Sequence, residues 1–188
     1  MSCCLTLFNR LTVLCEAEDD RMIYQYAAEK YLPELAADVN FVGSNGKSGT
    51  VKNLLLLKGR ELNAICILDI DILYSEELLN PLIISDPADL EQIRNLRMQL
   101  NAILSDKALK KDFRNSGVNS VNVMPLRTEI EEAISILIKY HVFVVEKGQL
   151  ESWMQVRKKD VKKVQQMINS IDSKVLRSLK RFLRTCLA

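Results

Sequence analysis

The sequence predicts an α/β fold with a mostly parallel four-stranded sheet, flanking helices and a helical C-terminal tail. Short apolar runs alternate with segments of helical periodicity, and the links between them are short. That alternation is typical of parallel sheets with right-handed crossovers. The 188 residues are enough to bury a core of this kind.

Three of the predicted strands lie in the N-terminal part of the chain. The apolar runs predict strands over residues 11–15, 38–42 and 63–68, and the helical periodicity predicts helices over 19–32 and 50–58. Asp19 or Asp20 is expected to cap the first helix, and Pro33 ends or follows it. A glycine-rich loop is expected over residues 43–49.

The remaining chain is predicted to be mainly helical, with one more strand. Asp86 and Pro87 form a good helix start, so a helix is expected from there to about residue 104. The other expected segments are a connector over 74–85, a polar loop with a short helix over 106–122, a helix over 129–140, a strand over 141–145 and an apolar helical stripe over 161–182.

Composition excludes several classes of protein. Hydrophobic residues make up 48% and charged residues 27% of the chain, no apolar run is long enough for a membrane span, and the N-terminus lacks the layout of a signal peptide. The five cysteines have no framework spacing, which favours reduced thiols and a cytoplasmic protein. Zinc is disfavoured because no CxxC occurs and His141 is the single histidine.

Charge is unevenly distributed although the net charge is only +2. From Glu151 onward, ten Lys and Arg residues stand against three acids, so this tail is strongly basic and the preceding part is acidic. A basic segment beside an acidic site suits a protein that grips a phosphate backbone. A solvated helix face is the alternative interpretation of the same charges.

Carboxylates follow two of the apolar runs. Glu16 ends the first strand, Asp20 lies four residues later, and Asp69 and Asp71 end the third strand. The C-terminal ends of parallel strands form the ligand crevice of such sheets, and clustered carboxylates suit hard cations. Asp20 as a helix cap, and the DxD pair as turn chemistry, are the structural alternatives.

The glycine-rich loop contains a Gly-Lys-Ser sequence but is not a P-loop, because too few residues separate the glycines. Lys47 remains a candidate phosphate-binding residue near the start of the following helix. An ordinary strand-to-helix turn is the alternative.

Four stretches together resemble the Toprim nuclease domain of the OLD (overcoming lysogenisation defect) family of ATP-dependent endonucleases. They are TVLCEAEDDRMIYQYAAE, FVGSNGKSGTVKNLL, AICILDIDIL and VFVVEKGQLESWM. They occur in the family's order and span most of residues 11–154, with looser agreement over 74–126. The resemblance implies a Rossmann-like Toprim catalytic domain over 1–154, with 74–126 as a helical insertion and 155–188 as a basic tail packed on it.

The resemblance also implies site residues and cofactors. In the family, the matching acids bind two divalent cations, Mg²⁺ or Mn²⁺, that activate water and stabilise the leaving oxygen. The matching acids here are Glu16, Asp20, Asp69, Asp71 and Glu151. A family lysine assists at the phosphate, and the candidates for it are Lys158, Lys159, Lys162 and Lys163, with Lys159 taken as catalytic and the others as DNA-binding.

The expected function is therefore a metal-dependent DNA endonuclease that works with an ABC-type ATPase domain or subunit. No Walker motif occurs in this chain. The apolar stripe is expected either to pack on this domain or to pair with a second copy in a homodimer, and the resemblance implies a role in phage defence. Ala17 and Gln149 stand where the family usually has glycine and an acid, and they favour the alternative of a non-catalytic Toprim module docking on an ATPase. A DxD phosphatase is the third possibility.

Overall fold

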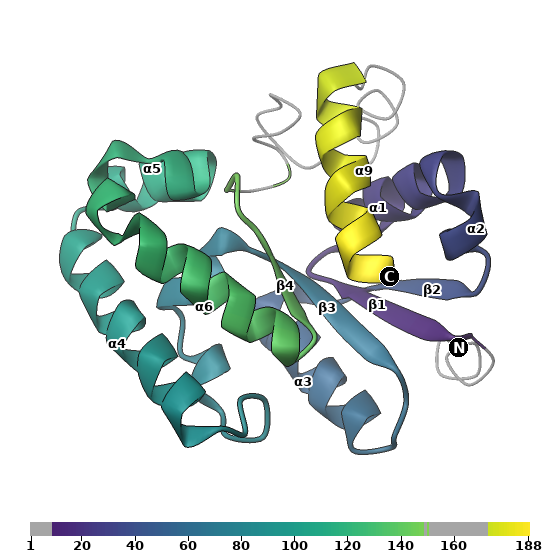
Figure 1. The fold of residues 1–188 in the computed structure, drawn as a ribbon, viewed down its shortest axis with the longest axis horizontal. Helices are drawn as coiled ribbons and strands as arrows, with labels where there is room; N and C mark the ends of the chain where they lie inside the picture. Colours follow the sequence, from purple (N-terminus) through teal and green to yellow (C-terminus); the bar gives the residue numbers. More distant parts are fainter. Residues whose placement is uncertain (1–8, 149, 151–172) are drawn as a thin grey trace. The chain divides into compact units, whose positions relative to one another are not determined.

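The computed structural model describes residues 9–148, 150 and 173–188 and has the predicted α/β architecture (Figure 1). Its sheet contains four parallel strands in the order β2-β1-β3-β4, so the fold class predicted from sequence is confirmed. The strands are β1 (Leu11–Cys15), β2 (Val39–Gly43), β3 (Ala64–Asp69) and β4 (Val142–Val145).

The chain divides into two compact units. The first unit comprises the residues up to Cys66 together with those from Trp153 onward, and the second unit comprises Ile67–Ser152. The division falls within β3. Each unit is described separately below.

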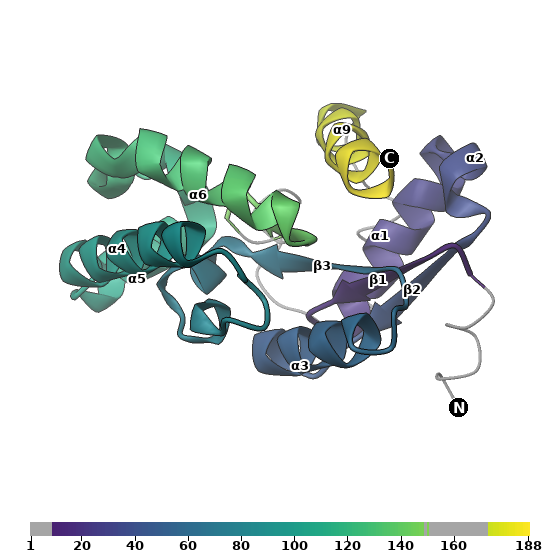
Figure 2. The ribbon, with the colours of Figure 1, turned by 60° about the horizontal axis from the view of Figure 1, so that its bottom comes forward.

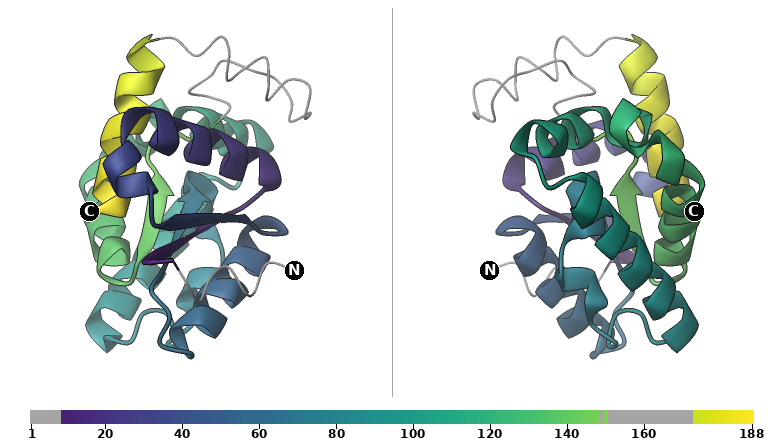
Figure 3. Two further views of the ribbon diagram at one scale, coloured as in Figure 1. Left: turned by 90° about the vertical axis from the view of Figure 1, so that its right-hand side faces the viewer. Right: turned by 90° about the vertical axis from the view of Figure 1, so that its left-hand side faces the viewer.

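In the first unit, helices cover both sides of β1 and β2. The helices are α1 (Glu18–Tyr31), α2 (Pro33–Ala36), α3 (Gly46–Lys58) and α9 (Ser173–Leu187). α1 and α3 lie on opposite sides of these two strands (Figures 2 and 3). All five residues of β1 are buried, because the strand is flanked by β2 and covered on both faces. A strand of this kind is expected to be apolar throughout, as LTVLC nearly is.

Helix α9 packs on α1 and α2 through its apolar face. Leu179 and Leu183 are fully buried, and the Phe182 ring lies 6.4 Å from the Tyr24 ring, centroid to centroid. The predicted helical tail is therefore confirmed over Ser173–Leu187. The part of the predicted apolar stripe before residue 173 lies outside the described residues.

The second unit is mainly helical. Its elements are η2 (Ile70–Tyr74), η3 (Glu77–Leu79), α4 (Pro87–Ile103), α5 (Lys107–Ser116), η4 (Gly117–Asn119), η5 (Val121–Leu126) and α6 (Arg127–Lys139), where η denotes a 3₁₀ helix. α6 packs against β4 and α4. The expected cap of α4 is confirmed, since the Asp86 carboxylate accepts hydrogen bonds from the N–H groups of Ala88 (2.7 Å) and Asp89 (3.2 Å).

Two helices differ from the prediction. α3 begins at Gly46 rather than at residue 50. The N–H groups of a first helical turn need acceptors from outside the helix, and Glu16 O accepts from the Gly46 N–H. α5 is a helix of 10 residues in the segment predicted as polar loop with a short helix. Its apolar face contains little beyond Leu109 and Phe113, too few residues to give a clear period.

Among the helices that the structure describes, none has the length and apolar character required to cross a bilayer.

Candidate functional site

The junction between β1 and α1 places two of the candidate acids. Glu16 follows β1 directly, and Asp20 is the third residue of α1. Asp20 is only 5% exposed, and its Oδ2 accepts a hydrogen bond of 3.1 Å from the Ala17 N–H. The helix cap is thus Ala17, and the expectation that Asp19 or Asp20 occupies the cap position is wrong. Asp20 instead stabilises the start of α1 from within the first turn, by accepting a hydrogen bond from the backbone of the cap residue.

Ala17 causes no backbone strain at this junction. Its φ of −134° and ψ of 166° are those of extended backbone, which any residue adopts. A glycine at this position is therefore not needed for its conformational freedom.

The glycine-rich loop holds the end of β1. The Ser44 N–H donates to Cys15 O (2.8 Å) and the Gly46 N–H donates to Glu16 O (2.9 Å). A Cβ on Gly43 would lie 2.6 Å from Glu18 Oε2 and 3.0 Å from Glu18 Cα, so only glycine fits there without movement of α1. The loop thereby fixes the backbone that carries Glu16. Lys47, the candidate phosphate ligand, is half-buried in the first turn of α3.

The junction between β3 and η2 places the other two acids. Asp69 ends β3 and is half-buried, whereas Asp71 lies in the 3₁₀ turn of η2 and is 7% exposed. The pair was expected at a strand end, and the structure instead places its second member in the turn. Asp71 forms an ion pair with Arg114 of α5, with 3.4 Å between Asp71 Oδ2 and Arg114 Nε.

Arg114 is a site neighbour that sequence reasoning missed. The signal in the sequence was a helix cap, Asp106, followed by four basic residues at helical spacing. The Asp106 carboxylate does cap α5, since it accepts from the N–H groups of Ala108 (2.6 Å) and Leu109 (3.2 Å). That signal was hidden because the segment was predicted to be mostly loop.

The backbone at Gly117, which follows α5, lies in close contact with the backbone around Gly148, which follows β4. We call this contact the glycine crossing. A Cβ on Gly117 would lie 1.9 Å from Glu146 O, and a Cβ on Gly148 would lie 2.4 Å from Arg114 O. Both glycines have positive φ, of 59° and 98°. The Val118 N–H donates to Glu146 O at 3.0 Å. These contacts fix the backbone beside Arg114.

Tyr74 lies beside this ion pair and is kept uncharged. Burial, followed by the negative charge of Asp71, raises the pKa of Tyr74 to about 12, although Arg114 opposes the rise. Its ring also contacts Phe113 (6.1 Å between centroids) and lies 5.5 Å from Lys110 Nζ. The phenol is therefore protonated at neutral pH.

Three cysteines of the first unit are buried and have free thiols. They are Cys15, Cys66 and Cys186. Burial raises the pKa of each thiol, so none of them is a thiolate at neutral pH.

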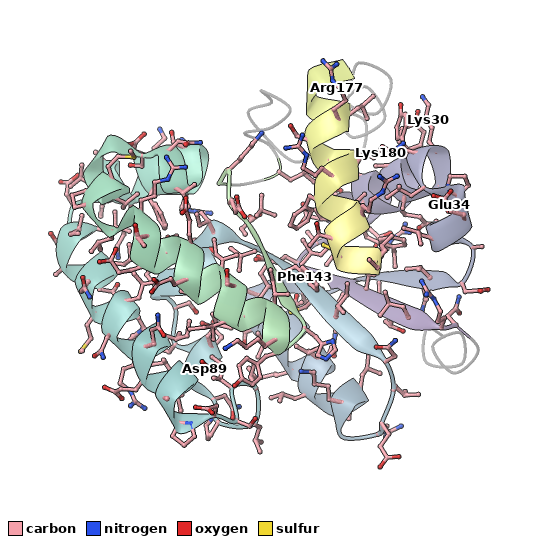
Figure 4. The ribbon with its side chains drawn as sticks, viewed as in Figure 1. Lys30, Glu34, Asp89, Phe143, Arg177 and Lys180 are labelled. Carbon is pink, nitrogen blue, oxygen red and sulfur yellow. The ribbon has the colours of Figure 1, made fainter. Side chains whose placement is uncertain are left out.

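The second unit also contains a shallow groove between α4 and α6 that includes none of the candidate residues. Its lining includes Asp89, which is labelled in Figure 4 and accepts hydrogen bonds from Tyr140 Oη (2.9 Å) and Lys139 Nζ (3.3 Å).

The candidate ligands at the two junctions, Glu16 with Asp20 and Asp69 with Asp71, all present carboxylate oxygens, which are the ligands that hard divalent cations prefer. Within the described part of the chain, no group of three or more Asp, Glu, His or Cys side chains is close enough to hold a metal ion. Each unit by itself supplies one pair of candidate acids. The remaining candidates lie outside the described residues: Glu151, Lys158, Lys159, Lys162 and Lys163.

Among known proteins, matches to the chain come from solved structures. No protein-family model and no curated protein matches the chain. Solved structures of the C-terminal region of the Xanthomonas campestris pv. campestris OLD protein do match. The platinum-phased structure has 16% identity and a TM-score of 0.42, and the match covers 97% of this chain and 82% of that one. The mercury-phased structure has 17% identity and a TM-score of 0.40, with 96% and 83% covered.

These values describe a distant likeness, which by itself assigns neither activity nor site residues to this chain. The matched protein carries the name of the family that the sequence motifs resemble.

Proposed function

We propose that the protein is a divalent-metal-dependent endonuclease that nicks or cleaves DNA by phosphodiester hydrolysis. The observation that carries this proposal is an arrangement that occurs twice in the chain. A buried strand, β1 or β3, leads directly into a pair of acids, and one acid of each pair is buried: Asp20 in the first unit and Asp71 in the second. Burying carboxylates is costly, which favours a site where their charge is used.

The proposed ligands of Mg²⁺ or Mn²⁺ are the five acids Glu16, Asp20, Asp69, Asp71 and Glu151. When bound, such cations supply an activated water and stabilise the charge on the leaving oxygen. Lys47 and Lys159 are proposed to contact the substrate phosphate, with Lys158, Lys162 and Lys163 on the neighbouring DNA backbone.

The attacking oxygen is proposed to come from water rather than from a side chain. Tyr74 stays protonated beside Asp71, and the buried thiol of Cys15 stays protonated beside Glu16. Neither is an activated nucleophile at neutral pH. In the reaction, the water oxygen bonds to phosphorus while one ester oxygen of the phosphodiester leaves.

An ABC-type ATPase domain or subunit is the proposed partner. The support for it is the sequence resemblance to ATP-dependent endonucleases. The ATPase would then regulate access to DNA, and this chain would hold the cleavage site.

The test is nicking of supercoiled plasmid with Mn²⁺, Mg²⁺ or chelator, using the wild type, Asp69→Asn and Asp71→Asn. Nicking should require the metal and fall by at least about 100-fold in both variants, because each loses a proposed ligand. Asp89→Asn is the matched control, since it neutralises an aspartate of the same unit that is paired with Lys139. It should nick at the wild-type rate.

The same series separates the alternatives. Equal nicking by the wild type and both variants would overturn the assignment of the DxD pair. Absence of nicking together with absence of Mn²⁺ binding, measured by calorimetry, would favour the non-catalytic module. Hydrolysis of p-nitrophenyl phosphate without nicking would favour the phosphatase.

A further inference from the structure

Helix α5 presents a continuous basic face. Lys110 and Lys111 lie three and four residues after Lys107, and Arg114 lies four and three residues after them, so all four side chains lie along one side of the helix. Lys107, Lys111 and Arg114 are exposed and Lys110 is partly so. Phe113, on a neighbouring side of the helix, is fully buried and anchors α5.

The one acid of α5 does not neutralise this face. Asp112 accepts hydrogen bonds from Ser116 Oγ (3.2 Å) and Ser120 Oγ (2.8 Å), which direct it to the turn after the helix. Asp112 therefore leaves the charges of the three lysines of this face in place. One end of the face is defined by the ion pair between Arg114 and Asp71.

We propose that this basic face of α5 binds the phosphate backbone of the DNA strand that the protein cleaves. From Lys107 to Arg114 the face is roughly 10 Å long, which corresponds to about three phosphates along one strand. Arg114 at the end of this face is ion-paired with Asp71 through Nε, and Lys107 and Lys111 beside it are exposed to solvent. Backbone bound along α5 thus leads to the proposed metal ligand.

Helix α9 is also basic, and its Arg177 and Lys180 are seen on the helix surface in Figure 4. α5 is the stronger candidate because its basic face contacts one of the proposed ligands within the same unit. This inference rests on the proposed function, since it takes DNA as the substrate.

The experiment measures DNA binding without cleavage. A fluorescently labelled duplex of about 20 base pairs is titrated in chelator at several salt concentrations, and affinity is read from anisotropy. The test variant carries Lys107→Gln, Lys110→Gln and Lys111→Gln, which remove three charges and keep long polar side chains. The slope of log K against log salt should become shallower by about 2 to 3, and affinity at low salt should fall by about 10-fold or more.

The matched control carries Arg94→Gln, Arg127→Gln and Lys139→Gln. These changes remove the same charge from the same unit, at residues that are ion-paired with Glu91, Glu131 and Asp89. The control should change the slope by less than about 1. Circular dichroism and the thermal midpoint confirm that both variants fold.

A wild-type slope in the α5 variant, or an equal change in the control, overturns the inference. Metal-dependent nicking by the wild type would then leave the proposed function standing. Conversely, α5-dependent binding without any metal-dependent nicking would overturn the proposed function and leave the binding surface in place.

Discussion

The β1–α1 and β3–η2 junctions share a pattern, an apolar strand followed by two candidate acids, but they hold their buried carboxylates differently. Asp20 accepts a hydrogen bond from the backbone N–H of Ala17, three residues before it. Asp71 instead pairs with the side chain of Arg114, which lies far along the sequence. The first arrangement is local to one turn of helix, and the second depends on how the second unit packs.

This difference indicates which of the two junctions is vulnerable. The first is held by hydrogen bonds from a neighbouring loop to the β1 backbone, at Cys15 and Glu16. The second depends on the glycine crossing that attaches α5 to the end of β4. Substitutions at that crossing, far from Asp71 in sequence, should therefore disturb the second junction alone.

The largest effect is expected for Gly117→Ala. Its φ is 59°, and the new Cβ would lie 1.9 Å from Glu146 O, so the crossing must open. The free energy of unfolding should fall by about 2 kcal/mol or more, measured by urea denaturation followed by circular dichroism. Hydrogen exchange should increase in the second unit.

Gly49→Ala is the control for this change. Gly49 lies within α3, and the nearest side-chain atom, Asn45 Cβ, is 3.8 Å from the added Cβ. Alanine is the better helix former, so this variant should be stabilised by up to about 1 kcal/mol. A loss in Gly49→Ala equal to that in Gly117→Ala would contradict the close approach at the crossing.

The sequence predicted the elements with strong local signals. β1 and β3 were found because they are continuous apolar runs, and α4 because Asp86 and Pro87 mark its start. The four acids at the strand ends were candidates for the same reason. The start of α3 was not predicted because it depends on a contact with Glu16, distant in sequence, and the extent of α5 was not predicted because the helix has too few apolar residues to show a period.

The pairing of Asp71 with Arg114 shows the same limit. The spacing of the basic residues within α5 brings them to one face of the helix. The glycine crossing with β4 then positions this face so that Arg114 pairs with Asp71. Such a crossing leaves only two isolated glycines in the sequence, and isolated glycines are equally common in turns, bulges and helix ends.

A smaller effect is expected when the local contact of the first junction is removed. Asp20→Ala leaves the Ala17 N–H without its carboxylate acceptor, and the free energy of unfolding should fall by about 1 kcal/mol. Asp20→Asn keeps an oxygen acceptor and should retain most of that stability. Equal losses in the two variants would show that the charge, rather than the hydrogen bond, is what matters.

The smallest effect is expected for Arg114→Gln. The Arg114 side chain is 47% exposed and the ion-pair distance is 3.4 Å, so the pair should contribute only about 0.5 kcal/mol. Solvent ions screen it, and the destabilisation should shrink as NaCl is raised from ~0.05 M to ~0.5 M in urea denaturation. The loss caused by Asp20→Ala should be unchanged over the same range. A salt-independent loss in Arg114→Gln would instead mean that Arg114 stabilises the unit by packing of its aliphatic stem rather than by its charge.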